Sequence, residues 1–451
     1  MSVIHLNNKD TIVAQATPAG IGAIHLLRMS GNLSFHVLNQ IIKKESNQWN
    51  SHTVHLCQIF EMDKHIDESL VSVFKGPNTY TGEDVVEISC HGSEYVLNKI
   101  MQLCIEHGAR LAEPGEFTLR AFLNNKIDLS QAEAVSDLIN SENQSSHQAA
   151  ISQLKGGISD LIKQLKKDIL QFTSLVELEL DFGEEDVEFA NRNQLKNTLL
   201  TIVEQIQSLL ISFNSGNAVK KGIPVAIVGR PNAGKSSLLN YLLKDDRAIV
   251  STIAGTTRDT IEEKFNINGI TFRLIDTAGI RETEDEIEKI GVEKTLTKIN
   301  EAQIVLYVFD VLEINEEQVL SDLENIPSDK KVIVVGNKMD VANVQYDKIK
   351  PVLISAKFGN NINELEHELC LDYETVLANS NSIIINQRHF QSLSNSLTYL
   401  NQAIQGIDSQ IHTDLLAEDL KMAIYYLSEI TGEITNDEIL ANIFSQFCIG
   451  K

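Results

Sequence analysis

The chain has little of what marks secreted, membrane or zinc-scaffold proteins. Its 451 residues include only 5 cysteines, 7 prolines and 1 tryptophan, and no two cysteines form a C-x-x-C pair. This spacing argues against a disulfide framework and a zinc ribbon. No run of about 18 consecutive apolar residues is present to span a bilayer, and the N-terminus MSVIHLNNKD lacks the organisation of a signal peptide. We therefore expect a cytoplasmic protein with no membrane partner.

Positive charge is also scarce. The sequence has 38 basic against 62 acidic side chains, a formal net charge of -24. Such a surface repels polyanions over most of its area. A nucleic-acid partner would need a local basic patch or a partner protein, because phosphate contacts supply most of the salt-dependent affinity. The contribution of surface charge to solubility is by itself a sufficient explanation of the acidic excess.

A phosphate-binding loop is the first informative feature that is present. Residues 229–236 read GRPNAGKS, of the form G-x-x-x-x-G-K-[ST]. Its glycines let backbone N–H groups close around phosphate, while Lys235 neutralises charge and Ser236 offers a hydroxyl to Mg²⁺. DTAG at 276–279 and NKMD at 337–340 follow at the spacing of GTPases. Because the motifs occur together and in this order, a chance match of the phosphate-loop pattern to an ordinary strand-to-helix turn is a poor explanation.

The NKMD motif selects the base. The carboxylate of Asp340 can accept hydrogen bonds from both N1–H and the 2-amino group of guanine, whereas adenine has no such pair of donors on that edge. Asn337 can meet the N7/O6 side. SAK at 355–357 resembles a further guanine-contacting loop of this superfamily. The sequence therefore predicts a GTP-binding protein.

The runs around these motifs predict a parallel sheet that binds its ligand at one edge. IPVAIVG at 223–229 is an apolar β-branched run, and SSLLNYLL at 236–243 has the apolar spacing of a following helix. TFRLIDTAG, IVLYVFD and KVIVVGNKMD are further apolar runs, each ending in a polar site. Open parallel sheets bind ligands at those carboxyl ends.

Helical periodicity lies on both sides of the GTPase segment. The apolar residues that recur at three- and four-residue steps are Leu154, Ile158, Leu161, Leu165, Ile169, Phe172 and Val176, then Leu393, Leu397, Leu400, Ile404, Leu416, Leu420, Ile424 and Leu427. Each amphipathic set needs a partner. We therefore predict a multidomain fold: an α+β domain at 1–118, and a discontinuous all-α helical domain at 119–217 and 378–451. An α/β P-loop GTPase domain at 218–377 is inserted into the helical domain.

Long motifs outside the GTPase segment carry a family resemblance. They are DTIVAQATPAGIGAIHLLRMSG at 10–31, GPNTYTGEDVVEISCHG at 76–92, EPGEFTLRAFLNNKIDLSQAEAVSDLI at 113–139, IAGTTRD at 253–259 and the terminal FCIGK. With them, essentially the whole chain closely resembles the MnmE (TrmE) family of tRNA wobble-uridine modification GTPases. The resemblance implies a folate-binding and dimerising N-terminal domain, a discontinuous helical domain and an inserted G domain.

The resemblance also implies a reaction and its partners. A homodimer, assembled as a heterotetramer with the FAD-dependent MnmG (GidA) protein, would act on certain tRNAs. It would add an aminomethyl or carboxymethylaminomethyl group to C5 of the wobble uridine. The carbon would come from 5,10-methylene-tetrahydrofolate, of which 5-formyl-tetrahydrofolate is an analogue, and the other cofactors would be GTP, Mg²⁺ and K⁺.

Residue roles in the GTPase follow from the same resemblance. Ile280 follows DTAG and has no polar atom to orient water; the family uses a later glutamate, which matches Glu288. Without the resemblance, Glu288 is better interpreted as a solvated charge in an acidic run. The predicted cation ligands, all oxygen donors, are Ser236 and Thr257 for Mg²⁺, and Asn232, Ser251, Ile253 and Thr256 for K⁺. The predicted GTP-contacting residues are Asn232, Ala233, Gly234, Lys235, Ser236, Ser237, Ser251, Thr252, Ile253, Ala254, Gly255, Thr256, Thr257, Asp276, Thr277, Ala278, Gly279, Asn337, Lys338, Asp340, Ser355, Ala356 and Lys357.

The folate site and the C-terminus complete the predicted residues. The family pattern falls on Arg28, Glu87 and Lys126; a carboxylate suits the aminopyrimidine edge of a pterin, and basic groups suit the anionic glutamate tail. Taken alone, Arg28 is better interpreted as a surface residue and Lys126 as a loop cation. FCIGK holds Cys448 and Lys451. The resemblance favours a catalytic role for Cys448 near the modification site, whereas composition favours a buried packing residue.

Two other function classes stay open on the residues alone. A ribosome-assembly or RNA-associated regulatory GTPase would share the G motifs but would give no reason for the folate-like N-terminal motifs. Binding of a reduced folate separates that class from a modification enzyme. A pure interaction switch would bind nucleotide tightly and hydrolyse it slowly without an external activator.

Overall fold

The computed structural model describes residues 10–181, 191–244, 263–275, 297, 299–341, 345–378, 386–445 and 447–451. By its contacts the chain divides into two compact units. Unit 1 comprises Met1–Ser136, Gln153–Thr173 and Leu420–Lys451, and unit 2 comprises Asp137–Ser152 and Ser174–Asp419. Each unit therefore combines segments that are far apart in sequence.

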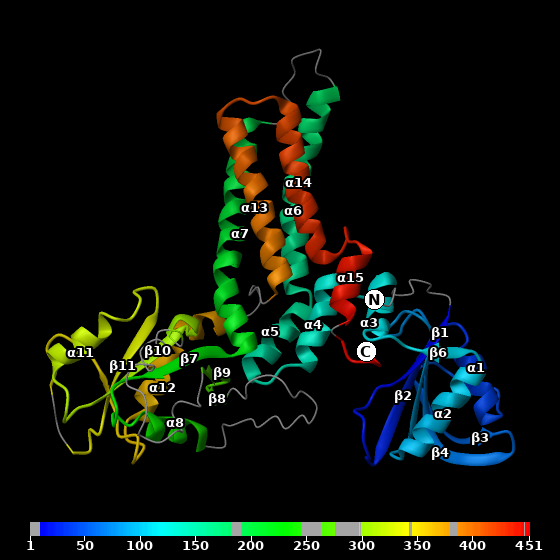
Figure 1. Cartoon of the computed structure of the whole chain (residues 1–451). Helices are drawn as coiled ribbons and strands as arrows, with labels where there is room; N and C mark the ends of the chain where they lie inside the picture. Colours follow the sequence, from blue (N-terminus) through cyan, green and yellow to red (C-terminus); the bar gives the residue numbers. More distant parts are fainter. Residues whose placement is uncertain are drawn as a thin grey trace. The chain divides into compact units, whose positions relative to one another are not determined.

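A six-stranded sheet, in the order β3-β4-β5-β2-β1-β6, forms the N-terminal part of unit 1 (Figure 1). Its elements in chain order are β1 (Thr11–Gln15), β2 (Ile24–Ser30), α1 (Ser34–Ile42), β3 (Thr53–Glu61), β4 (Lys64–Phe74), β5 (Val85–His91), α2 (Glu94–Glu106) and β6 (Ala109–Leu111). Only the pairing of β1 with β6 is parallel within this sheet. The mixture of strands and helices confirms the predicted α+β class.

Alternation of side chains gives this sheet two different faces. On one face, residues such as Leu27 and Ile88 join the core formed with α1 and α2. Their sequence neighbours Arg28 and Glu87 therefore point to the opposite face, because successive strand residues alternate. Phe117 packs on alternate residues of β1 in a separate small cluster. Phe117 thus covers the opposite face over β1, and Arg28 and Glu87 lie on the same face over the neighbouring strands β2 and β5.

Helices from distant parts of the chain complete unit 1. They are α3 (Glu116–Leu123), α15 (Asp437–Ser445) and parts of α4 (Leu129–Ile139), α5 (Gln144–Leu154), α6 (Gly157–Asp181) and α14 (Thr413–Thr431). Leu119, Leu129 and Phe444 share one core cluster. At Gly115, which has φ +71°, a Cβ would lie 2.6 Å from the carbonyl oxygen of Phe444, so this close approach requires glycine. The packing holds the C-terminal segment against N-terminal residues.

A second six-stranded sheet, in the order β12-β11-β10-β7-β9-β8, belongs to unit 2 (Figure 1). Its elements are β7 (Ile223–Val228), α8 (Lys235–Lys244), β8 (Lys264–Ile267), β9 (Ile270–Leu274), β10 (Ile304–Asp310), α11 (Glu316–Leu323), β11 (Lys331–Asn337), β12 (Val352–Leu353) and α12 (Ile362–Ala378). All pairings are parallel except that of β8 with β9. Cores on both faces explain the continuous apolar runs of its strands. This is the predicted α/β P-loop arrangement.

Helices from either side of the GTPase segment also pair in unit 2. α7 (Arg192–Lys221) and α13 (Gln387–Asp408) lie side by side (Figure 1). The rings of Phe213 and Phe390 are 4.5 Å apart between centroids. This pairing agrees with a discontinuous helical domain, and the multidomain fold class is confirmed. The domain boundaries at 118, 217 and 377 stay predictions.

None of the helices built from described residues is long and apolar enough to cross a bilayer.

Candidate functional site

The phosphate loop lies where β7 ends and α8 begins. Gly229 has φ +145°, and a Cβ there would lie 1.9 Å from the carbonyl oxygen of Val308. At Gly234, which has φ +93°, a Cβ would lie 2.0 Å from Nδ2 of Asn337. Both positions require glycine, because neither the backbone conformation nor the space admits a side chain. The loop leads into the N-terminus of α8, where unpaired backbone N–H groups favour an anion.

Lys235, the first residue of α8, turns back over the loop. Its Nζ donates to the carbonyl oxygens of Gly229 at 2.8 Å and Arg230 at 2.7 Å. Burial lowers the pKa of Lys235, because the charged ammonium loses hydration. The two carbonyl oxygens compensate the charge of the Lys235 ammonium group only in part. A bound phosphate would supply a full counter-charge. Ser236 follows and is exposed, and its hydroxyl is an oxygen donor of the kind that Mg²⁺ prefers.

Asn337 connects the phosphate loop with the SAK loop. Its Nδ2 donates to the carbonyl oxygen of Ala233 at 2.9 Å, and its Oδ1 accepts from the backbone N–H of Ala356 at 3.0 Å. The side chain is only 4% exposed. Asn337 therefore holds two nucleotide loops together in this structure, and its predicted contact with guanine stays a prediction.

The other two polar residues of NKMD differ in their surroundings. Lys338 has φ +70° and pairs with Asp310, a buried carboxylate at the end of β10. The hydrogen bond to Asp310 raises the pKa of Lys338. Asp340 is exposed. Sequence reasoning did not single out Asp310, although it is the polar end of the run IVLYVFD.

The remaining described members of the predicted GTP set fall in the same loops. Asn232 is exposed and has φ +59°, and Ser237 is exposed near the start of α8. Ser355 is fully buried, and Lys357 lies over the ring of Phe358 at 5.2 Å. The predicted residues outside the described ranges are Ser251, Thr252, Ile253, Ala254, Gly255, Thr256, Thr257, Asp276, Thr277, Ala278, Gly279 and Glu288. Their roles with GTP, Mg²⁺ and K⁺ stay predictions.

In unit 1, Arg28 and Glu87 form an ion pair across β2 and β5. The strand register places them opposite each other, and Nε of Arg28 lies 2.8 Å from Oε1 of Glu87. Their side chains are 18% and 21% exposed, so Arg28 is not the surface residue that its local context favours. The two line a cavity of about 290 Å³ together with His52, Phe74, Asn78, Thr79, Tyr80, Thr81 and Val85. Residues 78–81 were missed, although they belong to the GPNTYTGE motif of the family resemblance.

The C-terminal segment reaches the same ion pair. Nη1 of Arg28 donates to the carbonyl oxygen of Gly450 at 3.2 Å. At Gly450, which has φ +94°, a Cβ would lie 2.3 Å from the carbonyl oxygen of Gln15. Burial and, next, the charge of Arg28 lower the pKa of Lys451. Cys448 is exposed, so the interpretation of this thiol as a buried packing residue is wrong.

Lys126 does not line the cavity of Arg28 and Glu87. Its Nζ donates to the carbonyl oxygen of Pro77 at 2.8 Å, and its side chain lines a second hollow of about 630 Å³. The structure thus brings together two of the three predicted folate residues. The third lies in a neighbouring hollow.

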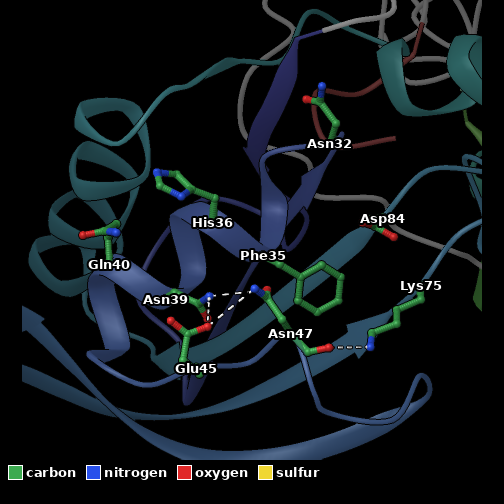
Figure 2. A pocket seen from close by; sticks show the side chains of 9 residues that line it. All are labelled: Asn32, Phe35, His36, Asn39, Gln40, Glu45, Asn47, Lys75 and Asp84. Carbon is green, nitrogen blue, oxygen red and sulfur yellow. Dashed lines mark hydrogen bonds between the residues drawn. The ribbon is translucent and has the colours of Figure 1, made fainter.

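A third hollow, of about 450 Å³, lies beside α1 and contains none of the predicted site residues (Figure 2). Nδ2 of Asn39 donates to Glu45 at 3.3 Å and to Asn47 at 3.4 Å. Nζ of Lys75 donates to the carbonyl oxygen of Asn47 at 2.8 Å. These bonds fix the loop that follows α1.

Comparisons with known proteins cover nearly the whole chain. A family model described as the MnmE helical domain matches residues 129–448, and one described as the GTP-binding protein TrmE N-terminus matches residues 11–126. The protein named tRNA modification GTPase MnmE in Flavobacterium johnsoniae is 49% identical, over 98% of this chain and 100% of that protein. Proteins of the same name in Cytophaga hutchinsonii and Bacteroides thetaiotaomicron are 48% and 46% identical, over 99% and 98% of this chain and 98% and 100% of theirs. A crystal structure of Era in complex with MgGDPNP and part of 16S ribosomal RNA is 34% identical over 33% of this chain and 56% of that chain, with a TM-score of 0.24.

Proposed function

The chain belongs to the MnmE family of tRNA modification GTPases, and on this premise we propose the chemistry that it performs. With a flavin-dependent partner protein, MnmG, it adds an aminomethyl or carboxymethylaminomethyl group to C5 of the wobble uridine of certain tRNAs. The carbon comes from methylene-tetrahydrofolate held at Arg28 and Glu87. The observation that carries the proposal is the Arg28–Glu87 ion pair, which lines a cavity and also contacts Gly450 of the C-terminal segment.

The residues that line the cavity support its assignment as a pterin site. Glu87 offers a carboxylate to the aminopyrimidine edge, and Phe74, Tyr80 and Val85 provide apolar walls for the ring. Arg28 supplies positive charge and lies over the ring of Phe117 at 5.9 Å. The volume of about 290 Å³ lies just below the roughly 300 to 1,000 Å³ of small-molecule pockets, which supports a ring inside the cavity and a tail outside it.

Each residue of the proposed nucleotide site has a role in binding or hydrolysis. Lys235 and the N-terminus of α8 stabilise the phosphates, and Asp340 selects guanine. Ser236 and Thr257 would hold Mg²⁺, which neutralises phosphate charge, and Asn232 would contribute to a K⁺ site. These residues belong to unit 2, whereas Arg28 and Glu87 belong to unit 1. We propose that hydrolysis biases a conformational equilibrium of the chain and takes no part in the carbon transfer.

We propose that a second copy of the chain packs on exposed apolar side chains of the unit 1 sheet. Val54, Leu56 and Leu70 are 61%, 62% and 49% exposed. Leu56 and Leu70 pair across β3 and β4, on the same face as Arg28 and Glu87. Exposed apolar groups that adjoin a ligand site mark an interaction surface. We propose a homodimer through this face, which in turn assembles as a heterotetramer with MnmG.

GTP hydrolysis is expected to depend on K⁺ and on pairing of two G domains. The residue after DTAG is Ile280, which cannot orient water, and the described Asn232 is an exposed oxygen donor in the phosphate loop. Replacing K⁺ by Na⁺ should slow turnover by at least about tenfold, because a charge-stabilising ligand of the transition state is lost. Turnover and sedimentation with a transition-state mimic, each in KCl and NaCl, measure both effects. Equal activity in the two salts with a monomeric G domain throughout would contradict the proposal.

Asp340→Asn should weaken GTP binding by about 100-fold, because the charged acceptor of two guanine N–H groups is lost. The variant should gain affinity for xanthosine triphosphate, whose additional oxygen accepts from the new amide. Competition binding with the two nucleotides measures this exchange. Asp329→Asn, which changes another exposed carboxylate of unit 2, is the matched control. Unchanged guanine selectivity in Asp340→Asn would remove Asp340 from the base site.

Nucleoside analysis tests the function as a whole. tRNA from a deletion strain should lack the C5 substituent at the wobble uridine, and the wild-type chain should restore it. A reconstituted mixture of this chain, the flavin partner, reduced folate, GTP and unmodified tRNA should form the same nucleoside. Normal modification in the deletion strain would leave only a regulatory role for the GTPase.

A further inference from the structure

The cavity of Arg28 and Glu87 shares a wall with the hollow that Lys126 lines. Thr81 lines the cavity, and its carbonyl oxygen accepts from Nδ2 of Asn124 at 2.7 Å. A Cβ on the next residue, Gly82, would lie 3.4 Å from Cδ of Lys126. The stem of Lys126 therefore packs on the loop that forms the cavity wall, and its ammonium group reaches Pro77 in the same loop. Lys126 therefore lies between the wall of the cavity and the second hollow.

This second hollow, which we name the tail pocket, has an apolar floor and a polar rim. Its lining residues are Phe122, Leu123, Asn125, Lys126, Ile127, Asp128, Gln131, Lys163, Thr431, Gly432, Glu433, Thr435 and Leu440. Leu123, Ile127 and Leu440 belong to the core cluster of α3, α4 and α15, so they form a fixed floor. The volume of about 630 Å³ exceeds that of the Arg28–Glu87 cavity.

The acidic residues of the tail pocket are engaged within the protein. Oδ1 of Asp128 accepts from Oγ of Ser130 at 2.9 Å and from the backbone N–H of Gln131 at 3.0 Å, which caps α4. Glu433 pairs with Lys166.

The two lysines that line the tail pocket keep donor capacity for a ligand. Lys163 is 58% exposed, and its Nζ lies 3.9 Å from Oδ2 of Asp128, too far for a strong pair. The ammonium group of Lys126 donates to the neutral carbonyl oxygen of Pro77, which does not offset its charge. Each ammonium group has three N–H donors, so both can accept an anionic ligand.

We propose that the tail pocket binds the γ-glutamyl tail of a polyglutamylated folate. The inference rests on the folate function proposed above and specifies its substrate class. Each added glutamate carries one α-carboxylate for a lysine, two methylene groups for the apolar floor and an amide for the hydroxyl of Thr435 at the rim. An RNA phosphate fits less well, because a phosphodiester gains nothing from an apolar floor and the surrounding protein is strongly acidic.

Calorimetry on the full chain with 5-formyl-tetrahydrofolate as monoglutamate and as triglutamate tests the tail pocket. The wild type should bind the triglutamate about tenfold more tightly, as one charge-assisted contact provides. Lys163→Ala should lose this preference while its affinity for the monoglutamate stays unchanged, which also shows that the variant is folded. Lys64→Ala, at an exposed lysine on the β3–β4 hairpin, should keep the preference.

The outcomes separate the two proposals. If the wild type binds both folates with equal affinity, the tail pocket is overturned and the folate site stands. If it binds neither, the folate site itself is wrong. If Lys163→Ala and Lys163→Glu keep the full preference for the triglutamate but weaken binding of tRNA, the pocket belongs to RNA and the inference is overturned.

Discussion

Glu87→Ala is expected to abolish wobble-uridine modification while GTP turnover stays nearly unchanged. The substitution removes the carboxylate proposed to bind the aminopyrimidine edge of the pterin, and it leaves Arg28, only 18% exposed, without its ion pair at 2.8 Å. Affinity for a reduced folate should fall by about 100-fold, because a charged acceptor of several hydrogen bonds is lost. GTP turnover should persist, because the described nucleotide residues belong to the other compact unit.

The measurement combines three readouts on one protein preparation. They are GTP turnover, calorimetry with 5-formyl-tetrahydrofolate, and nucleoside analysis of tRNA from a reconstituted mixture with the flavin partner. Glu68→Ala is the matched control, because it removes an exposed carboxylate from the neighbouring strand β4. Full modification by Glu87→Ala, together with unchanged folate binding, would disprove the assigned site. Loss of modification in both variants would show that the effect is not specific to Glu87 and that changes elsewhere on the sheet also impair modification.

Glu288→Ala should slow GTP hydrolysis by about 100- to 10,000-fold, the usual cost of removing a positioned general base. Its affinity for GTP should be retained, because Glu288 is proposed to orient the attacking water without touching guanine. The reason for choosing Glu288 is chemical: hydrolysis needs a positioned water, and Ile280 after DTAG has no polar atom for it. The position lies outside the described residues, so the assignment depends on the family resemblance.

Single-turnover hydrolysis and nucleotide titration distinguish this role from a general effect of charge. Glu284→Ala removes a carboxylate from the same acidic run and should hydrolyse GTP at nearly the wild-type rate. Near-normal turnover in Glu288→Ala would restore the interpretation of this residue as a solvated charge. An equal loss in both variants would assign the effect to the run as a whole.

Consecutive residues were sufficient to identify the GTPase and its sheet. The phosphate loop, DTAG and NKMD are local motifs, and the apolar runs that precede them are strands or parts of strands in the structure. The helical periodicity also identified α6, but it placed Leu161 on the buried face, whereas Ile162 is fully buried and Leu161 is half-buried. A helix shows its apolar stripe in sequence, but the neighbouring helices decide which side chains the stripe buries.

The predicted folate residues show what only the tertiary structure decided. Arg28 and Glu87 meet because the antiparallel register of β2 and β5 places them opposite each other, and Gly450 joins them from 422 residues away. In the structure Cys448 is exposed to solvent, and Lys126 lines the tail pocket. Local motifs succeed where the chemistry uses the backbone of adjacent residues, as in the phosphate loop. A site built across strands and a distant terminus depends on long-range packing, because strand register and the burial of the C-terminal segment are set by contacts that no short stretch of sequence contains.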